Sequence, residues 1–225
     1  MEQLSRPFLV LQYDNRVLSK CDLSLQKRNQ EYCKLHGYTY IFSNTHYDMP
    51  PYWIKVKIVQ EHLQTNKYKG ILWLDTDAVI HKTTISLEHL ALPGYSMYYC
   101  SDPQINGWDN KFNAGVWLIM NDELGNQLIN EWMAMYNKES WSFSSTKWIT
   151  TGPWAGIDYE QGAFNKRIIP KYQQNIHQYP WEIFQCHTIK NQNAFSFHFA
   201  MHLKRLYLED YVKKMPELYV HERHN

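Results

Sequence analysis

Short apolar runs alternate with longer amphipathic stretches along the first 80 residues of the chain. The runs at 8–13 (FLVLQY), 39–44 (TYIFSN) and 70–80 (GILWLDTDAVI) are typical of buried strands. Residues 22–35 and 52–66 are typical of helices. This β-α-β-α-β order predicts a mostly parallel sheet with helices on its faces, in which ligands bind beyond the carboxyl ends of the strands.

The same patterns indicate where helices end and which elements follow. Asp22 is a possible N-cap of the first helix, and His36-Gly37 supplies its C-terminal stop. The segments 96–100 (SMYYC) and 112–121 (FNAGVWLIMN) predict further strands, and 122–137 predicts an amphipathic helix. The α/β pattern therefore continues into the second half of the chain.

Residues 138–157 differ from the rest of the chain. They are rich in Ser, Thr, Gly and Trp without a clear period, which predicts a long functional loop or lid. The tail from Tyr207 onward is polar and predicts a surface helix with a frayed end. Since no repeat, low-complexity tract or linker divides the sequence, we expect one α/β domain.

Composition and charge narrow the classes of function. The 23 Lys plus Arg nearly balance the 22 Asp plus Glu, so no net charge attracts the chain to nucleic acid or to an anionic membrane. Aromatic residues make up 16% of the 225 residues, and Tyr and Trp rings suit stacking on the C–H faces of sugars.

The four cysteines lack paired spacing and are expected to be free thiols in a reducing compartment. The N-terminal apolar run is too short for a signal or a membrane span, so we expect a cytoplasmic protein, with recruitment to a glycan or membrane by a partner left open.

Two carboxylates interrupt the longest apolar run. Asp75 and Asp77 lie where a buried strand should end, and two such carboxylates repel one another unless a cation lies between them. Oxygen ligands suit Mg²⁺ or Mn²⁺, which usually take one or two carboxylates together with substrate phosphates. We therefore expect Asp75 and Asp77 to hold a divalent cation against a diphosphate. The alternative interpretation is a solvated loop that contains two acids.

An ordered set of motifs resembles a known group of enzymes. YCKLHGYTYIF, ILWLDTDAVI, FNAGVWLIMN, IDYEQGAFN and SFHFAMHLK are similar to the retaining glycosyltransferases of the GT-A fold, in the fungal galactosyl/mannosyltransferase and plant xyloglucan xylosyltransferase group, with glycogenin-like relatives. The resemblance covers roughly residues 8–205. It implies a single Rossmann-like GT-A domain over 1–225, with a nucleotide-binding half at about 1–80, an acceptor-binding half at about 81–205 and a tail at 206–225.

The resemblance also implies roles for single residues at the metal. Asp77 would ligate the cation directly, Asp75 would contact the cation and the donor's ribose or sugar, and His198 would complete the site. The relatives' motif H-x-x-G-x-x-K runs here from His198 to Lys204, so Lys204 would contact a phosphate oxygen. His202 is a rival ligand in the same segment.

Two positions of these motifs concern the approach of the donor to the backbone. Asn113 and Gly115 belong to an N-A-G stretch, and the matching stretch of the relatives lines the donor sugar. The alternative interpretation is an ordinary turn into a strand. Met201 replaces the glycine of the C-terminal motif, which puts in doubt a close approach of the backbone to the diphosphate.

The stretch from Asp158 to Gly162 resembles the D-Q or E-Q element beside the anomeric carbon. Glu160 takes the acidic position and Gln161 the amide position, and Asp158 is the alternative acid or part of a cluster that caps the next helix. A retaining transfer can proceed by front-side attack or through a covalent glycosyl-enzyme, and the sequence leaves both routes open.

Further residues are expected around the donor and the acceptor. Tyr13, at the end of the first strand, would stack on the nucleotide base, and Asn15 would hydrogen-bond it. Lys55 matches a W-x-K of the fungal and plant group and would reach the diphosphate. Acceptor binding is expected at the tryptophans of the candidate lid, Trp141, Trp148 and Trp154.

These residues predict a metal-dependent retaining glycosyltransferase that uses Mn²⁺ or Mg²⁺. The expected donor is a nucleotide-sugar, namely UDP-galactose, UDP-glucose or UDP-xylose ahead of GDP-mannose, and the acceptor is a hydroxyl of a glycan or glycoprotein. One alternative is a phosphohydrolase of the haloacid dehalogenase type, which would need a later G-D-x-x-x-D motif that the sequence lacks. Another is a carbohydrate-binding domain without turnover, which would be expected to have lost a metal ligand.

Overall fold

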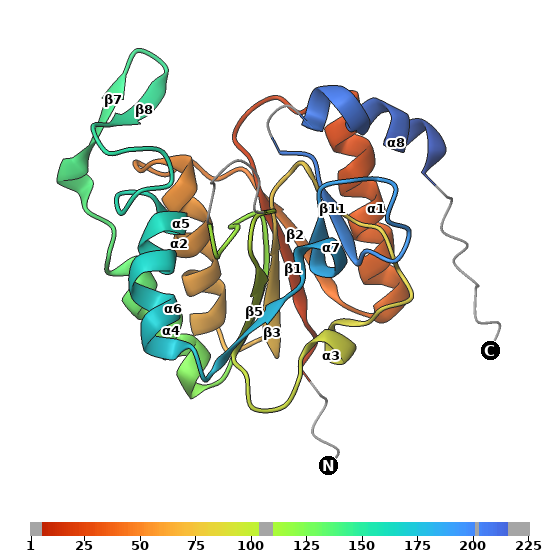
Figure 1. The fold of residues 1–225 in the computed structure, drawn as a ribbon, viewed down its shortest axis with the longest axis horizontal. Helices are drawn as coiled ribbons and strands as arrows, with labels where there is room; N and C mark the ends of the chain where they lie inside the picture. Colours follow the sequence, from red (N-terminus) through yellow and green to blue (C-terminus); the bar gives the residue numbers. More distant parts are fainter. Residues whose placement is uncertain (1–5, 104–109, 201–202, 216–225) are drawn as a thin grey trace.

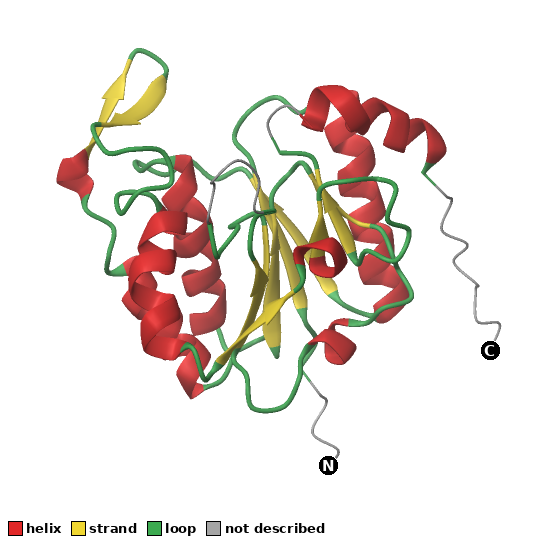
Figure 2. Cartoon of the chain, in the orientation of Figure 1, coloured by secondary structure: helices red, strands yellow, loops and turns green. Residues whose placement is uncertain are grey.

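The computed structural model describes residues 6–103, 110–200 and 203–215, apart from the side chains of Lys204 and Arg205. A central sheet lies between two layers of helices (Figures 1 and 2). β1 pairs in parallel with β2 and β3, and β5 with β9, whereas β6 runs antiparallel to its neighbours β3 and β5. The predicted α/β class with a mostly parallel sheet is therefore confirmed. The strand order is β2 (Thr39–Ser43), β1 (Leu9–Tyr13), β3 (Gly70–Leu74), β6 (Val116–Met120), β5 (Met97–Cys100) and β9 (Ile176–Tyr179).

Both faces of the central strands are buried, which explains their continuous apolar sequences. Because side chains alternate along a strand, Leu11 and Trp73 pack in the cluster that includes α2 and α4, while Val10 and Leu72 pack in the cluster that includes α1. The helical segments of the two layers are α1 (Lys20–His36), α2 (Pro51–Gln64), α4 (Glu123–Met133), α5 (Glu160–Ala163), the π-helical η2 (Phe164–Ile168) and α6 (Ile169–Tyr172).

Helix α1 begins earlier than the sequence pattern predicted. Its N-cap is Ser19, whose hydroxyl accepts the Asp22 N–H at 3.1 Å, while the Asp22 carboxylate accepts the Ser19 N–H at 3.2 Å. The prediction of Asp22 as N-cap was wrong, because Asp22 is the third helical residue of a capping box. Gly37 ends the helix in the left-handed conformation, as expected for a C-terminal stop.

One edge of the central sheet gathers the segments that carry the candidate site. The strands β1, β3, β5 and β9 end there at Tyr13, Leu74, Cys100 and Tyr179. Because β6 is antiparallel, it starts at this edge, with Val116 opposite Leu74. The loops that follow β1, β3, β5 and β9 therefore meet the loop that precedes β6 at this edge of the sheet.

A smaller sheet extends this edge. Its strand β11 lies between β10 and β4, parallel to the first and antiparallel to the second. Beside it, α8 packs against α1, which agrees with the helix predicted in the C-terminal tail. The three strands of this sheet are β4 (Ala78–Ile80), β10 (Gln185–Cys186) and β11 (Ser196–His198). Further helical segments of the chain are α3 (Leu87–Leu90), α7 (Trp181–Phe184), η3 (Lys204–Leu208) and α8 (Glu209–Lys214). Within the described ranges, no helix combines the length and the apolar character needed to cross a bilayer.

The segment predicted as a long loop contains a projecting hairpin. After the short helix η1 (Lys138–Ser140), strands β7 (Trp141–Ser144) and β8 (Lys147–Thr150) pair antiparallel (Figure 1). Ser145 adopts a positive φ of 57° at the turn. The prediction of an irregular segment was wrong over these residues, since four paired residues a strand are too few to give a clear hydrophobic period.

Candidate active site

The turn after β3 presents two carboxylates at the sheet edge. The Asp75 N–H donates to the carbonyl of Gly115 at 2.8 Å, and the Ala78 N–H donates to the carbonyl of Asp75 at 2.9 Å. The side-chain amide of Gln12 donates to the same Asp75 carbonyl at 3.1 Å. The backbone of the turn is thereby fixed, while the side chains of Asp75 and Asp77 stay 28% and 20% exposed.

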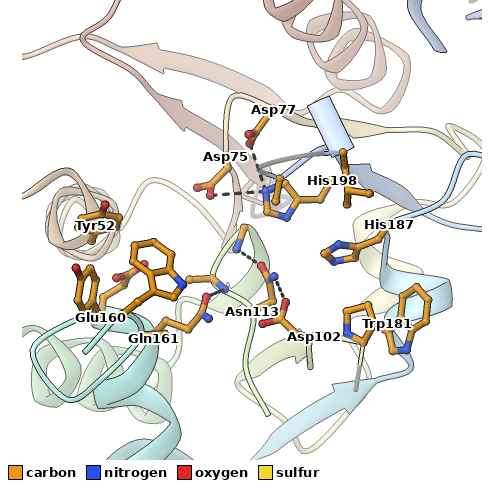
Figure 3. Close-up of a pocket in the computed structure, with 18 of the residues that line it drawn as sticks. Tyr52, Asp75, Asp77, Asp102, Asn113, Glu160, Gln161, Trp181, His187 and His198 are labelled. Carbon is orange, nitrogen blue, oxygen red and sulfur yellow. Dashed lines mark hydrogen bonds and ion pairs between the residues drawn. The ribbon is translucent and has the colours of Figure 1, made fainter. Parts of the chain in front are cut away.

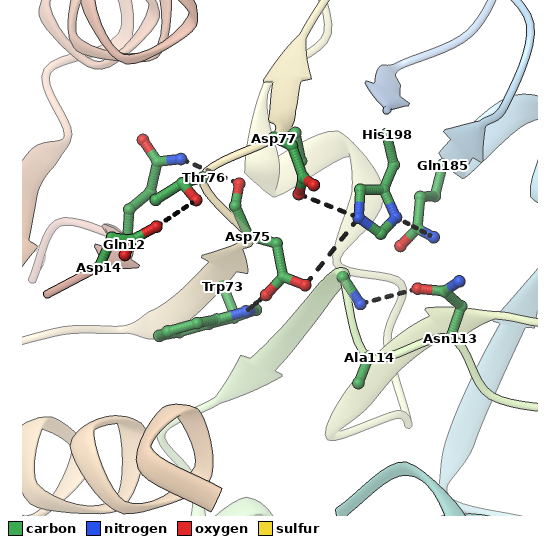
Figure 4. A network of polar contacts seen from close by, with 12 residues as sticks. Gln12, Asp14, Trp73, Asp75, Thr76, Asp77, Asn113, Ala114, Gln185 and His198 are labelled. Atoms are coloured by element: carbon green, nitrogen blue, oxygen red, sulfur yellow. Dashed lines mark hydrogen bonds and ion pairs between the residues drawn. The ribbon is translucent and has the colours of Figure 1, made fainter. Parts of the chain in front are cut away.

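His198 reaches these acids from the smaller sheet. Because β11 pairs with β4, His198 lies opposite Ala78, directly beside the acidic turn. Its Nε2 is 3.3 Å from Oδ1 of Asp77 and 3.9 Å from Oδ2 of Asp75 (Figure 4). One ligand atom from each of the three residues lies within 4.8 Å of the other two. The two carboxylates suit Mn²⁺ or Mg²⁺, the imidazole adds a nitrogen ligand, and further coordination positions are left for phosphate oxygens.

The surroundings of His198 favour positive charge at this position. Burial alone would lower the pKa of the imidazole, but the hydrogen bond and charge of Asp77, together with the charge of Asp75, raise this pKa above its ordinary value. Positive charge between the carboxylates is therefore stabilised. A cation bound to Nε2 would supply that charge in place of the proton, so the three residues fit a divalent metal ion.

Gly115 makes room for the imidazole. A Cβ on Gly115 would lie 2.3 Å from Cε1 and 2.5 Å from Nδ1 of His198. Real Cβ atoms do not approach a neighbour so closely, so the ring packs directly on the glycine backbone. The N-A-G stretch is therefore in contact with the histidine of the candidate metal site.

Lys55 joins the acidic turn to a buried glutamate. Its ammonium group donates to Oδ1 of Asp75 at 2.7 Å and lies 3.6 Å from Oε1 of Glu160. The indole N–H of Trp73 donates to the same Oδ1 of Asp75 at 2.8 Å. Asp75 is therefore oriented with its other oxygen toward His198. Lys55, predicted to reach the diphosphate, lines the cavity but has both neighbouring carboxylates as partners.

Glu160 is a buried acid next to this ammonium group. Only 3% of the residue is exposed, and Oε2 has no hydrogen-bond partner among the described residues. Burial raises the pKa of Glu160 to about 7, against the lowering effect of Lys55. The carboxyl group is therefore poised to change charge near neutral pH.

Substituting Glu160 with glutamine tests this environment through stability. The folded state holds the Glu160 proton more tightly than the unfolded chain, so the free energy of unfolding falls as pH rises from about 4.5 to about 7. We expect Glu160→Gln to remove a decrease of the order of 3 kcal/mol across this range. Urea unfolding of both proteins between pH 4.5 and 8 measures it. Parallel stability curves for the two proteins would contradict the assigned pKa.

The neighbours of Glu160 differ in their access to the cavity. Gln161 lines the cavity, and its Oε1 accepts the Ala114 N–H at 2.9 Å, which leaves the amide N–H groups to offer to a ligand. The side chain of Asp158 instead packs against Gly152. Asp158 is not among the described residues that line the cavity, so Glu160 is the better placed of the two candidate acids.

Asp102 was missed by the sequence analysis. It lies beyond the carboxyl end of β5, as Asp75 lies beyond that of β3, and this position was the available signal. The side-chain amide of Asn113 donates to the Asp102 carboxylate, and Oδ1 of Asn113 accepts the Gly115 N–H at 2.8 Å. The predicted Asn113 therefore connects two loops that line the cavity.

A smaller cavity of about 280 Å³ lies beyond β1, where the nucleotide was predicted. Tyr13 and the exposed Asn15 both line it. The guanidinium of Arg16 donates to the Asp14 carboxylate at 2.7 and 2.9 Å, and the hydroxyl of Thr76 donates to it at 2.9 Å. Burial would raise the pKa of Asp14, but these bonds and the charge of Arg16 lower it below its ordinary value. The sequence analysis missed the ion pair between Asp14 and Arg16. The hydrogen bond from Thr76 to Asp14 joins the loop after β1 to the acidic turn.

The main cavity has a volume of about 860 Å³ and has aromatic walls (Figure 3). Tyr52, Trp154 and Tyr159 form a cluster whose ring centroids are 4.9–5.5 Å apart. Trp181 and His187 line it as well, with ring centroids 5.9 Å apart. Acids, amides and rings thus face one space that is large enough for a nucleotide-sugar.

Three predicted positions of the C-terminal motif are not described. Met201 and the rival ligand His202 lie outside the described residues. Lys204 begins η3, but its side chain is outside the description too. The phosphate contact expected from Lys204 therefore remains a prediction.

Comparisons with known proteins show which enzymes the chain is similar to. The galactosyl transferase GMA12/MNN10 family matches residues 11–98. The chain is 25% identical over 121 residues to galactomannan galactosyltransferase 1 of Cyamopsis tetragonoloba, across 48% of this chain and 26% of that protein. It is 28% identical over 121 residues to glycosyltransferase 6 of Arabidopsis thaliana, across 48% of this chain and 27% of that protein. The chain therefore spans about a quarter of the length of these relatives.

A solved structure extends the likeness to nearly the whole chain. A glycosyltransferase involved in the glycosylation of the major capsid of PBCV-1 superimposes with a TM-score of 0.70 at 12% identity, covering 92% of this chain and 99% of that one. The fold is that of the GT-A glycosyltransferases. The resemblance to galactosyl transferases, which the sequence motifs indicated, is confirmed over residues 11–98.

Proposed function

We propose that this chain is the catalytic domain of a metal-dependent, retaining glycosyltransferase that takes a hexose or pentose from a UDP-sugar. The observation that carries the proposal is the convergence of Asp75, Asp77 and His198 within 4.8 Å beside a cavity of about 860 Å³. A phosphohydrolase is disfavoured, because both the family match and the curated relatives are glycosyltransferases.

The candidate metal site supplies the leaving-group side of the reaction. A divalent cation there would neutralise the charge that builds on a departing diphosphate. Lys55 and Trp73 orient Asp75 through its Oδ1, so the chain positions a ligand rather than offering Lys55 as a free phosphate contact. The smaller cavity, lined by Tyr13 and Asn15, would receive the nucleoside.

Glu160 and Gln161 lie on the opposite side of the reacting sugar in this proposal. The amide of Gln161 would donate to a sugar hydroxyl, and the Glu160 carboxylate would stabilise positive charge on the ring as the leaving group departs. A covalent route needs a carboxylate oxygen in contact with the anomeric carbon. The burial of Glu160 beneath Lys55 favours the front-side route, in which the acceptor attacks from the face of the leaving group.

A donor panel tests the proposed activity. Release of nucleoside diphosphate would be followed with UDP-galactose, UDP-glucose, UDP-xylose and GDP-mannose, each with Mn²⁺, with Mg²⁺ and with EDTA. Metal-dependent release from at least one UDP-sugar is the expected result. An absence of metal-dependent release from every donor, with or without a glycan acceptor, would contradict the proposal and favour a carbohydrate-binding domain without turnover.

Among the three tryptophans predicted for the acceptor, Trp154 is the one we propose. Trp141 is 7% exposed and donates its indole N–H to the carbonyl of Asp158 at 3.2 Å. Trp148 packs on Phe143 within the hairpin, with ring centroids 5.5 Å apart. Trp154 is 53% exposed and lines the main cavity, so its ring is available to stack on a sugar acceptor.

Removing the Trp154 ring should impair transfer more than donor hydrolysis. We expect Trp154→Ala to lower transfer to a glycan acceptor roughly fivefold relative to hydrolysis of the donor, because an aromatic stacking contact contributes about 1 kcal/mol. The matched control is Phe143→Ala, which removes a ring that is 60% exposed on the hairpin. An equal ratio of transfer to hydrolysis in wild type and Trp154→Ala would rule out this acceptor contact.

A further inference from the structure

The histidine of the candidate metal site has a buried neighbour with no role in the proposed chemistry. Gln185 is 0% exposed, and its side-chain amide lies 3.1 Å from Nδ1 of His198 (Figure 4). Gln185 does not line the main cavity, so it cannot contact a substrate there. Any contribution it makes to the reaction must pass through the imidazole.

The pairing of two short strands determines this contact. Gln185 in β10 lies opposite Ser196 in β11, and His198 follows Ser196 by two residues. Since side chains alternate along a strand, Ser196 and His198 point to the same face, and the long Gln185 side chain reaches diagonally to the ring. The contact is therefore built into the smaller sheet and does not depend on a loop.

The amide of Gln185 can serve two tautomers of His198. With only Nε2 protonated, the ring donates toward Asp77, and Nδ1 accepts from the Gln185 NH₂ group, whose nitrogen lies 3.1 Å from Nδ1. In this arrangement Oε1 of Gln185 is buried without a hydrogen-bond partner. A ring that binds a cation through Nε2 must instead carry its proton on Nδ1, and that proton needs an acceptor.

We propose that Gln185 is the positioning residue of the metal site and that its amide turns over when a cation binds, so that Oε1 accepts the proton on Nδ1 of His198. This inference rests on the proposed metal site. Rotation of the amide by about 180° exchanges its two ends with little change in shape, because the oxygen and the nitrogen occupy equivalent positions. Gln185 then selects the tautomer whose Nε2 lone pair faces Asp75 and Asp77.

Substitution of Gln185 distinguishes this role from simple packing. Gln185→Leu removes the acceptor and is expected to weaken Mn²⁺ binding roughly 10- to 100-fold. Gln185→Glu keeps an acceptor for the Nδ1 proton and is expected to bind Mn²⁺ within about threefold of wild type. Ser196→Ala is the matched control: it deletes the buried hydroxyl that donates to the Phe184 carbonyl at 2.6 Å and leaves the contact between Gln185 and His198 intact.

The experiment measures Mn²⁺ affinity directly, by the loss of the free Mn²⁺ signal in electron paramagnetic resonance, with and without UDP. In parallel, ¹⁵N spectra of histidine-labelled protein with Mg²⁺ report which nitrogen of His198 is protonated. The proposal is supported if Gln185→Leu binds Mn²⁺ more weakly than wild type while Gln185→Glu and Ser196→Ala keep the wild-type affinity. It also requires that His198 carries its proton on Nδ1 when the metal is bound. Equal affinity of wild type and Gln185→Leu overturns the role of Gln185 alone, whereas no Mn²⁺ binding by wild type overturns the metal site as well.

Discussion

Asp77→Asn is expected to reduce metal-dependent turnover at least about a hundredfold. Mutation of residues that only hydrogen-bond to metal ligands already lowers the affinity of a protein for its metal 10- to 100-fold, and Asp77 is proposed to be a ligand itself. The substitution keeps the shape of the side chain and removes the negative charge of the carboxylate. Oδ1 of this carboxylate lies 3.3 Å from Nε2 of His198. Asp77 is 20% exposed, so we expect the fold to be unaffected. Turnover would be measured as nucleoside diphosphate release over a series of Mn²⁺ concentrations with the best donor of the panel, and compared at the concentration that just saturates the wild type.

Asp48→Asn is the control for this substitution. Asp48 is an exposed acid paired with Lys138 on the surface, and it does not line either cavity. It should turn over like wild type. If Asp77→Asn kept wild-type turnover and the same dependence on Mn²⁺, Asp77 would not be a ligand and the assignment of the acidic turn would be wrong.

Gly115→Ala is expected to have the second large effect, through His198. The added methyl group would lie 2.3 Å from Cε1 of the imidazole, so the ring must leave its position or the loop before β6 must shift. We expect a loss of stability of about 1–3 kcal/mol, which is typical of overpacking a buried site. Mn²⁺ affinity should fall at least about tenfold, because a displaced ring no longer faces Asp75 and Asp77.

A double-mutant cycle separates these two effects. In the His198→Ala background the imidazole is gone, so Gly115→Ala should cost little stability there, and the two changes should be strongly non-additive. Metal binding should stay weak in the double variant because the ligand is missing. Additive losses of stability would show that Gly115 does not act through the ring of His198.

The sequence carried enough information to predict the layers of the fold and the position of the acidic turn. Buried strands are continuously apolar, so an interruption such as Asp75 and Asp77 marks a strand end, and the end of a parallel strand is where ligands bind. His198 was found only through the resemblance of its motif. Nothing local distinguishes it from other histidines, and its meeting with the acids depends on the pairing of β11 with β4.

Contacts between distant segments explain what sequence reasoning could not supply. The close approach of Gly115 and His198 is a property of the folded chain, since no spacing relates the two residues. Lys55 matches a motif, yet only the packing of α2 shows that it lies between Asp75 and Glu160. Gln185 belongs to a strand of two residues, which is too short to leave a period in the sequence.

The most direct test of the metal site is anomalous diffraction from crystals grown with Mn²⁺ and UDP. An anomalous peak is expected between Asp75, Asp77 and Nε2 of His198, at about 2.0–2.3 Å from the carboxylate of Asp77 and in contact with the diphosphate. A peak elsewhere, or a diphosphate bound with no manganese while Nε2 of His198 remains 3.3 Å from Asp77, would contradict it.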